Sequence, residues 1–128
     1  MKKVVISGSA KLEEKINYWL DYFKNKNYNI LDYPVPIQEN VFLEEYPNIH
    51  KNFFKAITNC DILFIMNEDK NGLLGYIGPS TFSELAFGIV QNLIYNKNIE
   101  IILLKLPDEI SLWLKLDWIK LYKEHELN

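Results

Sequence analysis

The stretch CDILFIM, residues 60–66, does most to decide the fold, because every position of Ile62–Met66 is apolar. A half-exposed strand alternates apolar with polar residues, whereas an unbroken apolar run is typical of a parallel strand covered on both faces. We therefore expect a buried parallel strand here. Three further short runs are interpreted as strands: Lys3–Ser7, Tyr28–Asp32 and Ile99–Leu104.

Apolar residues between these strands recur at the spacing of amphipathic helices. The first expected helix carries on one face Leu12, Ile16, Trp19, Leu20 and Phe23. The second carries Ile49, Phe53, Ala56, Ile57 and Cys60. The third follows a polar loop at residues 67–78 and is expected to bury Phe82, Leu85, Ala86, Ile89, Val90, Leu93 and Ile94.

Two further segments have weaker patterns. Pro47 is expected to break any helix that crosses it, because proline lacks the N–H that continues a helix. Pro107 and Asp108 are expected to start a short helix that runs to about Lys115. Trp118–Tyr122 is interpreted as an edge strand, with a last helical turn as the alternative.

Strands that alternate with helices predict right-handed crossovers and helices on both faces of one parallel sheet. The expected fold class is therefore α/β, a flavodoxin-like or Rossmann-like three-layer sandwich with four to five parallel strands. A length of 128 residues fits one domain, and no repeat or linker divides residues 1–128.

Composition excludes several classes of protein. The net charge of −3 and the pI of about 5.4 argue against nucleic-acid binding. No apolar run approaches the roughly 20 residues of a membrane span, and the N-terminus lacks the pattern of a signal peptide. Cys60 is the single cysteine, expected to be a small buried hydrophobe, so we expect a reduced, cytoplasmic setting.

The polar residues that follow the expected strands indicate where a ligand would bind, because parallel α/β sheets bind ligands outside the carboxyl ends of their strands. Ser7-Gly8-Ser9 follows the first strand and could hold phosphate or sugar oxygens, or form a plain turn with Ser9 as a helix N-cap. Asp32 and Tyr33 follow the second strand. After the third, Asn67 and Asp69 could bind a base or ribose, or be solvated loop residues.

The stretch GYIGPSTFSELAFG, residues 75–88, leads from this edge into the third expected helix. Pro79 suits the first helical turn, and Glu84 would lie close behind it, where the helix dipole favours an ionised carboxylate. Such a carboxylate could be a nucleophile or a ligand-binding group. A capping box, with Thr81 as the N-cap and Glu84 reaching back to its N–H, is the structural alternative.

Three of these segments together resemble the nucleoside 2-deoxyribosyltransferase-like superfamily, which includes deoxynucleoside-monophosphate N-glycosidases. They are the strand that ends in Ser7-Gly8-Ser9, the CDILFIM strand, and SELAFG at residues 83–88. The resemblance implies covalent catalysis, in which Glu84 attacks the anomeric carbon of a deoxyribose. It also implies that the sugar, phosphate or base is bound by Gly8, Ser9, Asn67, Asp69, Gly78, Ser80 and Thr81.

The chain also differs from that family at two places. The aspartate of the family that lies near the nucleophile would fall at about Phe53, with His50 and Asn52 beside it. The arginine that follows the first serine in the glycosidase branch has no counterpart except Lys11. The alternative function is therefore a non-catalytic nucleotide-binding domain of the same fold.

A lesser similarity is to the glycine-rich loop of the cytokinin-activating phosphoribohydrolases. It is carried by the stretch Gly78-Pro-Ser-Thr81-Phe-Ser-Glu84. In either family the expected partner is a small nucleoside or nucleotide, and the resemblance implies a homo-oligomer. No cofactor is expected. No metal site is expected either, because His50 and His125 lack neighbours at ligand spacing.

Overall fold

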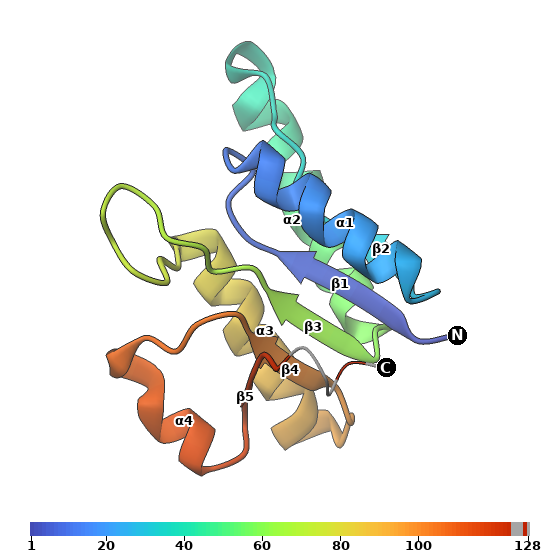
Figure 1. Cartoon of the computed structure of the whole chain (residues 1–128). Coiled ribbons are helices and arrows are strands. Elements are labelled where there is room, and N and C mark those ends of the chain that lie inside the picture. The colour runs from blue at the N-terminus through green and yellow to red at the C-terminus, as the bar shows by residue number, and fades with distance from the viewer. Residues whose placement is uncertain (124–126, 128) are drawn as a thin grey trace.

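The computed structural model describes residues 1–123 and 127, and these form a five-stranded sheet between helices (Figure 1). The strands are β1 (Lys3–Ser7), β2 (Asn29–Asp32), β3 (Ile62–Ile65), β4 (Glu100–Leu103) and β5 (Lys120–Leu121). Their order is β2-β1-β3-β4-β5, and every neighbouring pair is parallel. The predicted α/β class is confirmed, and so is the edge strand near the C-terminus.

The helices are α1 (Glu13–Asn25), α2 (Phe42–Thr58), α3 (Pro79–Tyr95) and α4 (Ser111–Lys115), with 3-10 turns η1 (Glu39–Val41) and η2 (Asp108–Ile110). Figure 1 shows α1 on one face of the sheet and α2 and α3 on the other. Among the described helices, none combines the length and the apolarity that crossing a membrane requires.

Both faces of the central strands are covered, which explains their unbroken apolar runs. Val4 and Ile6 pack with α1, whereas Val5 packs on the opposite face with α2 and α3. Strand β3 alternates in the same way between the two apolar clusters. Ser7 follows this alternation and is directed at α3, so the last residue of β1 places a buried hydroxyl beside that helix.

Pro47 does not break a helix as the sequence predicted, because α2 begins at Phe42 and continues through it. Pro47 is the sixth residue of α2, so the N–H that it lacks would have bonded to the carbonyl of Leu43. Leu43 is 88% exposed, and water can hydrate the carbonyl that is left over. The helix therefore tolerates the proline near its first turn.

The buried face of α3 is narrower than the sequence predicted. It consists of Thr81, Glu84, Leu85, Gly88, Ile89 and Gln91. Phe82, Val90, Leu93 and Ile94 were expected in the core but are 42–65% exposed. A helix that is apolar on most sides gives no periodic signal for the side that faces the sheet. The finding leaves an apolar outer face on α3.

Gly88 allows α3 to approach the sheet closely, and this gives a testable prediction. A Cβ on residue 88 would lie 2.7 Å from Leu63 Cδ2 and 3.2 Å from Ile101 Cδ1. We expect Gly88→Ala to lower the free energy of unfolding by about 1–3 kcal/mol, because overpacking outweighs the gain in helix propensity. Urea denaturation measures this change.

The double variant with Leu63→Val is the matched control, since valine lacks the Cδ2 atom that clashes. The cost of Gly88→Ala should shrink in that background. Equal costs in both backgrounds would contradict the close contact with Leu63.

Candidate functional site

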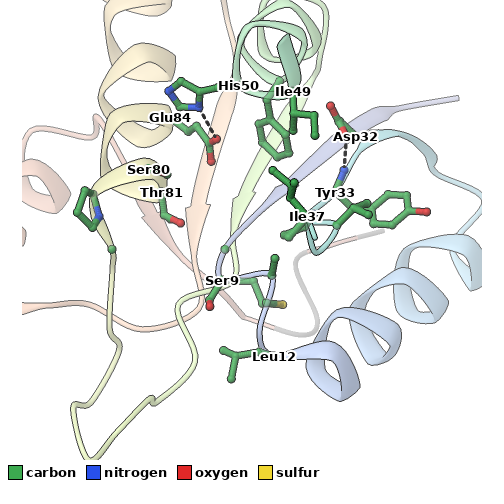
Figure 2. Close-up of a pocket in the computed structure, with 18 of the residues that line it drawn as sticks. Ser9, Leu12, Asp32, Tyr33, Ile37, Ile49, His50, Ser80, Thr81 and Glu84 are labelled. Carbon is green, nitrogen blue, oxygen red and sulfur yellow. Dashed lines mark hydrogen bonds and ion pairs between the residues drawn. The ribbon is translucent and has the colours of Figure 1, made fainter. Parts of the chain in front are cut away.

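A cavity of about 630 Å³ opens at the carboxyl ends of the strands (Figure 2). The strand order reverses between β1 and β3, and ligands of parallel α/β sheets bind at that point. Gly8 and Ser9 line the cavity after β1, Asp32 and Tyr33 at the end of β2, and Met66 after β3. The start of α3 completes it with Gly78, Pro79, Ser80, Thr81 and Glu84.

Glu84 lies in this cavity with its two carboxyl oxygens in different surroundings. Ser7 Oγ donates a hydrogen bond to Oε1 from the end of β1. On the other side, Oε2 lies 3.6 Å from Nδ1 of His50. Only 9% of the Glu84 side chain is exposed. One oxygen is thus held against the sheet, while the other faces an imidazole.

Burial raises the pKa of Glu84 from its ordinary 4.5 to about 7. The hydrogen bond from Ser7 opposes the rise, and the negative charge of Asp32 adds to it. The predicted preference for the ionised form is therefore wrong. Because α3 begins at Pro79, Glu84 lies in the second turn, beyond the free N–H groups of the helix start.

The capping-box alternative is also wrong. The residue that caps α3 is Gly78, and no side chain caps the helix. Thr81 is the third residue inside α3 and is 7% exposed. Glu84 bonds to Ser7 across 77 residues of sequence rather than to the nearby backbone. Its carboxyl group therefore belongs to the contact between α3 and the sheet.

Asp32 supplies a second carboxyl group to the cavity. Its Oδ1 accepts a hydrogen bond of 2.8 Å from the N–H of Tyr33, a contact visible in Figure 2. Burial raises the pKa of this carboxyl group, and the hydrogen bond from Tyr33 partly opposes the rise. Asp32 and Glu84 come from β2 and α3, so the sheet edge brings together two carboxyl groups that burial keeps from ionising easily.

His50 is a site residue that sequence reasoning did not place beside Glu84. It belongs to a row of rings along α2, in which Phe42, Tyr46, His50 and Phe54 follow each other four residues apart. The Tyr46 and His50 rings stack with centroids 5.3 Å apart. A hydrogen bond between the hydroxyls of Tyr46 and Ser80 links this row to the start of α3. The four-residue spacing predicts that these rings share one face of a helix, and the family resemblance puts His50 beside the position of the absent aspartate. Neither signal shows that His50 contacts Glu84.

Lys70 provides a positive charge at the cavity. Its Nζ donates a 3.0 Å hydrogen bond to Ser9 Oγ and lies 5.2 Å from the centre of the Tyr76 ring. Among the described lining residues, Lys70 is the only lysine or arginine. Ser9 does not cap a helix, because α1 begins at Glu13 with Leu12 before it. The Ser9 hydroxyl instead accepts the hydrogen bond from the Lys70 ammonium group.

Gly8 is held between two strand ends. A Cβ there would lie 3.0 Å from the backbone oxygen and from Cε of Met66. A larger residue would force the segments after β1 and β3 apart. The glycine therefore allows the ends of β1 and β3 to lie close together, beside the point where the strand order reverses.

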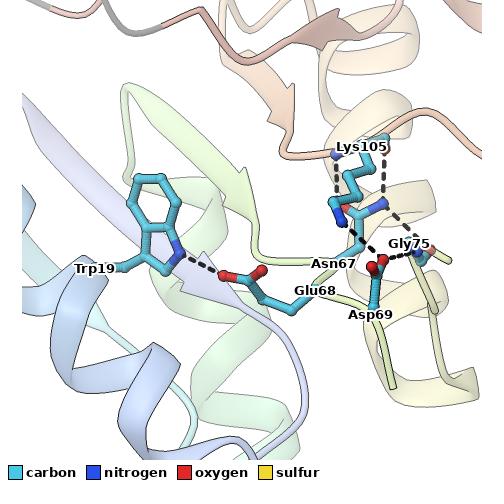
Figure 3. Close-up of polar contacts among 6 residues, drawn as sticks. All are labelled: Trp19, Asn67, Glu68, Asp69, Gly75 and Lys105. Carbon is cyan, nitrogen blue, oxygen red and sulfur yellow. Dashed lines mark hydrogen bonds and ion pairs between the residues drawn. The ribbon is translucent and has the colours of Figure 1, made fainter. Parts of the chain in front are cut away.

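Asn67 and Asp69, both predicted to bind a ligand, hold the following loop instead of lining the cavity (Figure 3). Asn67 Nδ2 donates to the carbonyl oxygens of Gly75 and Lys105, and its Oδ1 accepts from the Lys105 N–H. Asp69 Oδ1 accepts 2.8 Å bonds from the Gly75 N–H and from Lys105 Nζ. Glu68, between them, lines the cavity and accepts a 3.0 Å bond from Trp19 Nε1.

Among the described residues, neither a metal site nor a reactive cysteine adds to this cavity. Within residues 1–123 and 127, no cluster of histidine, cysteine and acidic side chains could hold a metal ion. His125 lies outside the described residues. Cys60 is buried as predicted, and burial raises the pKa of its thiol to about 12. Asp61 accepts a hydrogen bond from the N–H of Lys3 at the amino edge of the sheet, away from the cavity.

Comparison of the chain with protein-family models gives no match, and comparison with curated proteins gives none either.

The raised pKa of Glu84 predicts a pH-dependent stability. Between pH 4.5 and about 7, folded Glu84 keeps a proton that the unfolded chain has lost. The free energy of unfolding should therefore fall as pH rises through this window, and stay lower above it. Glu84→Gln lacks the ionisation and keeps an oxygen for Ser7. We expect it to gain stability over the wild type, by up to about 3 kcal/mol near pH 8.

Urea denaturation of both proteins at pH 5, 6, 7 and 8 measures the difference. The gain of Glu84→Gln should grow with pH and level off above pH 7. A difference that stays constant from pH 5 to 8 would show that Glu84 titrates normally.

Proposed function

We propose that this protein cleaves or transfers at the N-glycosidic bond of a deoxynucleoside, nucleoside or nucleotide, with Glu84 as the nucleophile. The observation that carries the proposal is the position of this carboxyl group. Glu84 is buried at the carboxyl edge of the sheet, held through Oε1 by Ser7, and faces a cavity of about 630 Å³. Pockets that bind small molecules have volumes of roughly 300–1,000 Å³.

Covalent catalysis at an anomeric carbon requires a fixed carboxylate. Ionised Glu84 would attack C1′ through the oxygen that Ser7 does not hold, and the C1′–N bond would break with its electron pair moving to the base. The sugar would then be an ester of Glu84. Attack by water would give hydrolysis, and attack by a second base would give transfer. Two easier steps replace one difficult displacement.

The walls of the cavity suit the parts of a nucleotide. Tyr33, Phe42, Tyr46 and Tyr76 offer aromatic faces for a base. Gly8, Ser9, Ser80 and Thr81 offer backbone and hydroxyl groups for the sugar or a phosphate. Lys70 beside Ser9 adds the positive charge that a phosphate favours.

A non-catalytic nucleotide-binding domain is the second candidate. The observation that favours it is the raised pKa of Glu84, since a protonated carboxyl group is a poor nucleophile. Phe53 also stands where the resemblance would require an aspartate, and it is 6% exposed in the core. Binding without cleavage would fit these facts.

Two further properties are part of the proposal. A second copy of the chain is proposed as a partner, and the exposed apolar outer face of α3, with Phe82, Val90 and Leu93, supports this. A cytoplasmic location is proposed from the single, buried cysteine.

Release of free base tests the main proposal. We expect the wild type to liberate base from at least one member of a panel of nucleosides, deoxynucleosides and their 5′-monophosphates, measured by chromatography. Glu84→Gln should abolish release while the fold is retained. The matched control is Glu100→Gln, in which the same change is made in β4 beside Lys2 and Lys120, and it should release base as the wild type does.

If the wild type releases no base but members of the panel raise its melting temperature, the protein is the non-catalytic nucleotide-binding domain of the second candidate. If neither effect occurs, both candidates fail.

The Lys70–Ser9 pair predicts a preference for phosphorylated ligands. Lys70→Gln should weaken binding of a nucleoside 5′-monophosphate by about 10-fold or more, because a charge-assisted hydrogen bond is lost. Binding of the matching nucleoside should change little. Calorimetric titration measures both, and Lys2→Gln, at the amino edge of the sheet, is the control. Equal weakening of the two ligands would place Lys70 outside a phosphate site.

A further inference from the structure

His50 lies beside the oxygen of Glu84 that Ser7 does not hold. Nδ1 of the imidazole is 3.6 Å from Oε2, which is longer than the 2.7–3.2 Å of an N–H···O hydrogen bond. Catalytic hydrogen bonds often shorten only when the substrate binds, and a movement of less than 1 Å would complete this one. The two side chains come from α2 and α3, so their contact is made by helix packing.

We propose that His50 exchanges a proton with Glu84, so that the imidazole takes the proton when the carboxylate forms and then passes it to the departing base. This inference rests on the proposed function and names a second catalytic residue for it. Histidine is suited to the task because it gains and loses a proton near neutral pH.

The imidazole ring is held in place and remains accessible from the cavity. Tyr46 stacks on it with an interplanar angle of 13°, and the Phe54 ring is 4.4 Å away, centre to centre. Both His50 and Glu84 line the cavity, and 23% of the His50 side chain is exposed. A substrate in the cavity could therefore touch the ring without displacing it.

The charges around the pair make a proton acceptor necessary. Burial raises the pKa of Glu84, Ser7 opposes the rise through a neutral hydrogen bond, and the charge of Asp32 adds to it. Tyr46 and Ser80 flank the pair with hydroxyl groups, while Glu68 and Lys70 also line the cavity. Lys70 is bonded to Ser9. Among the described residues, His50 is the basic side chain in contact with Glu84, with Nδ1 3.6 Å from Oε2, and the two form an ion pair when the imidazole is protonated.

The proton balance closes over both steps. Glu84 gives its proton to Nδ1 of neutral His50, and the carboxylate forms a bond to C1′. The C1′–N bond breaks, its electron pair goes to the base nitrogen, and the imidazolium protonates that nitrogen. In the second step, neutral His50 takes a proton from the attacking water. The oxygen of that water bonds to C1′ as the C1′–O bond to Glu84 breaks and its electron pair returns to the carboxylate. The free sugar departs, and the imidazolium of His50 returns its proton to Glu84.

An NMR titration tests the exchange without requiring activity. With ¹³C-labelled glutamate, the Glu84 carboxyl signal is assigned by its loss in Glu84→Gln and followed from pH 4 to 9 in the wild type, His50→Gln and His50→Phe. Both His50 variants should raise the titration midpoint of Glu84 by about half a pH unit or more, since a cationic imidazolium no longer stabilises the carboxylate. An unchanged midpoint would overturn the inference.

The phenylalanine variant separates proton exchange from packing. It keeps an aromatic ring between Tyr46 and Phe54 but cannot carry a proton. If His50 only packed α2 against its neighbours, His50→Phe would behave as the wild type does. If His50 exchanges a proton with Glu84, both variants should raise the titration midpoint of Glu84 to the same extent. Far-ultraviolet circular dichroism should confirm that both variants are folded.

Base release gives the second readout. Both variants should lower kcat at pH 7 by about 100-fold or more, the usual size of a general acid–base contribution, with a much smaller change in KM. We expect a bell-shaped pH profile of kcat for the wild type, and both variants should lose its alkaline limb. Wild-type kcat in His50→Phe would overturn the inference but leave the proposed function intact. If the wild type releases no base, the proposed function fails, and the NMR titration alone decides the exchange.

Discussion

The hydrogen bond between Ser7 and Glu84 is the contact on which the site depends, because it joins the last residue of β1 to the second turn of α3. A buried carboxyl group without a partner would cost several kcal/mol. Here the Ser7 hydroxyl satisfies one oxygen, and a raised pKa lets the group stay neutral part of the time. The same burial fixes the carboxyl group at the cavity and makes its ionisation depend on its neighbours.

Much of the fold could be predicted from the sequence because burial on both faces leaves a strong pattern. Ile62–Met66 marked a covered parallel strand, and β3 occupies Ile62–Ile65 next to β1 and β4. Pro79 was expected in the first helical turn and is the first residue of α3, whereas the capping-box alternative placed the N-cap at Thr81, three residues after the observed Gly78. Local patterns could not decide between these starts, since the contact with Ser7 is made across the sheet.

The candidate site was predicted unevenly, and the reason is sequence separation. Gly8, Ser9 and Glu84 follow from the rule that ligands bind at the carboxyl edge of a parallel sheet. The contact of His50 with Glu84 depends on how α2 packs against α3, which no local spacing reveals. Asn67 has the chemistry of a ligand-binding residue, but its amide satisfies backbone groups of Gly75 and Lys105. Residue type alone cannot separate those two roles.

The distribution of charge in the cavity restricts how a nucleotide could lie in it. Asp32, Glu68 and Glu84 line the cavity with carboxyl groups, and Lys70 beside Ser9 is the counter-charge. A phosphate placed near Glu84 would raise the pKa of that carboxyl group further and oppose the ionisation that the proposed nucleophile requires. A phosphate at Lys70 avoids this repulsion, since Figure 2 shows Ser9 on another wall from Glu84 and His50. In the proposed function, the sugar would then span from Ser9 to Glu84, and a phosphate held by Lys70 would direct the anomeric carbon toward the carboxylate.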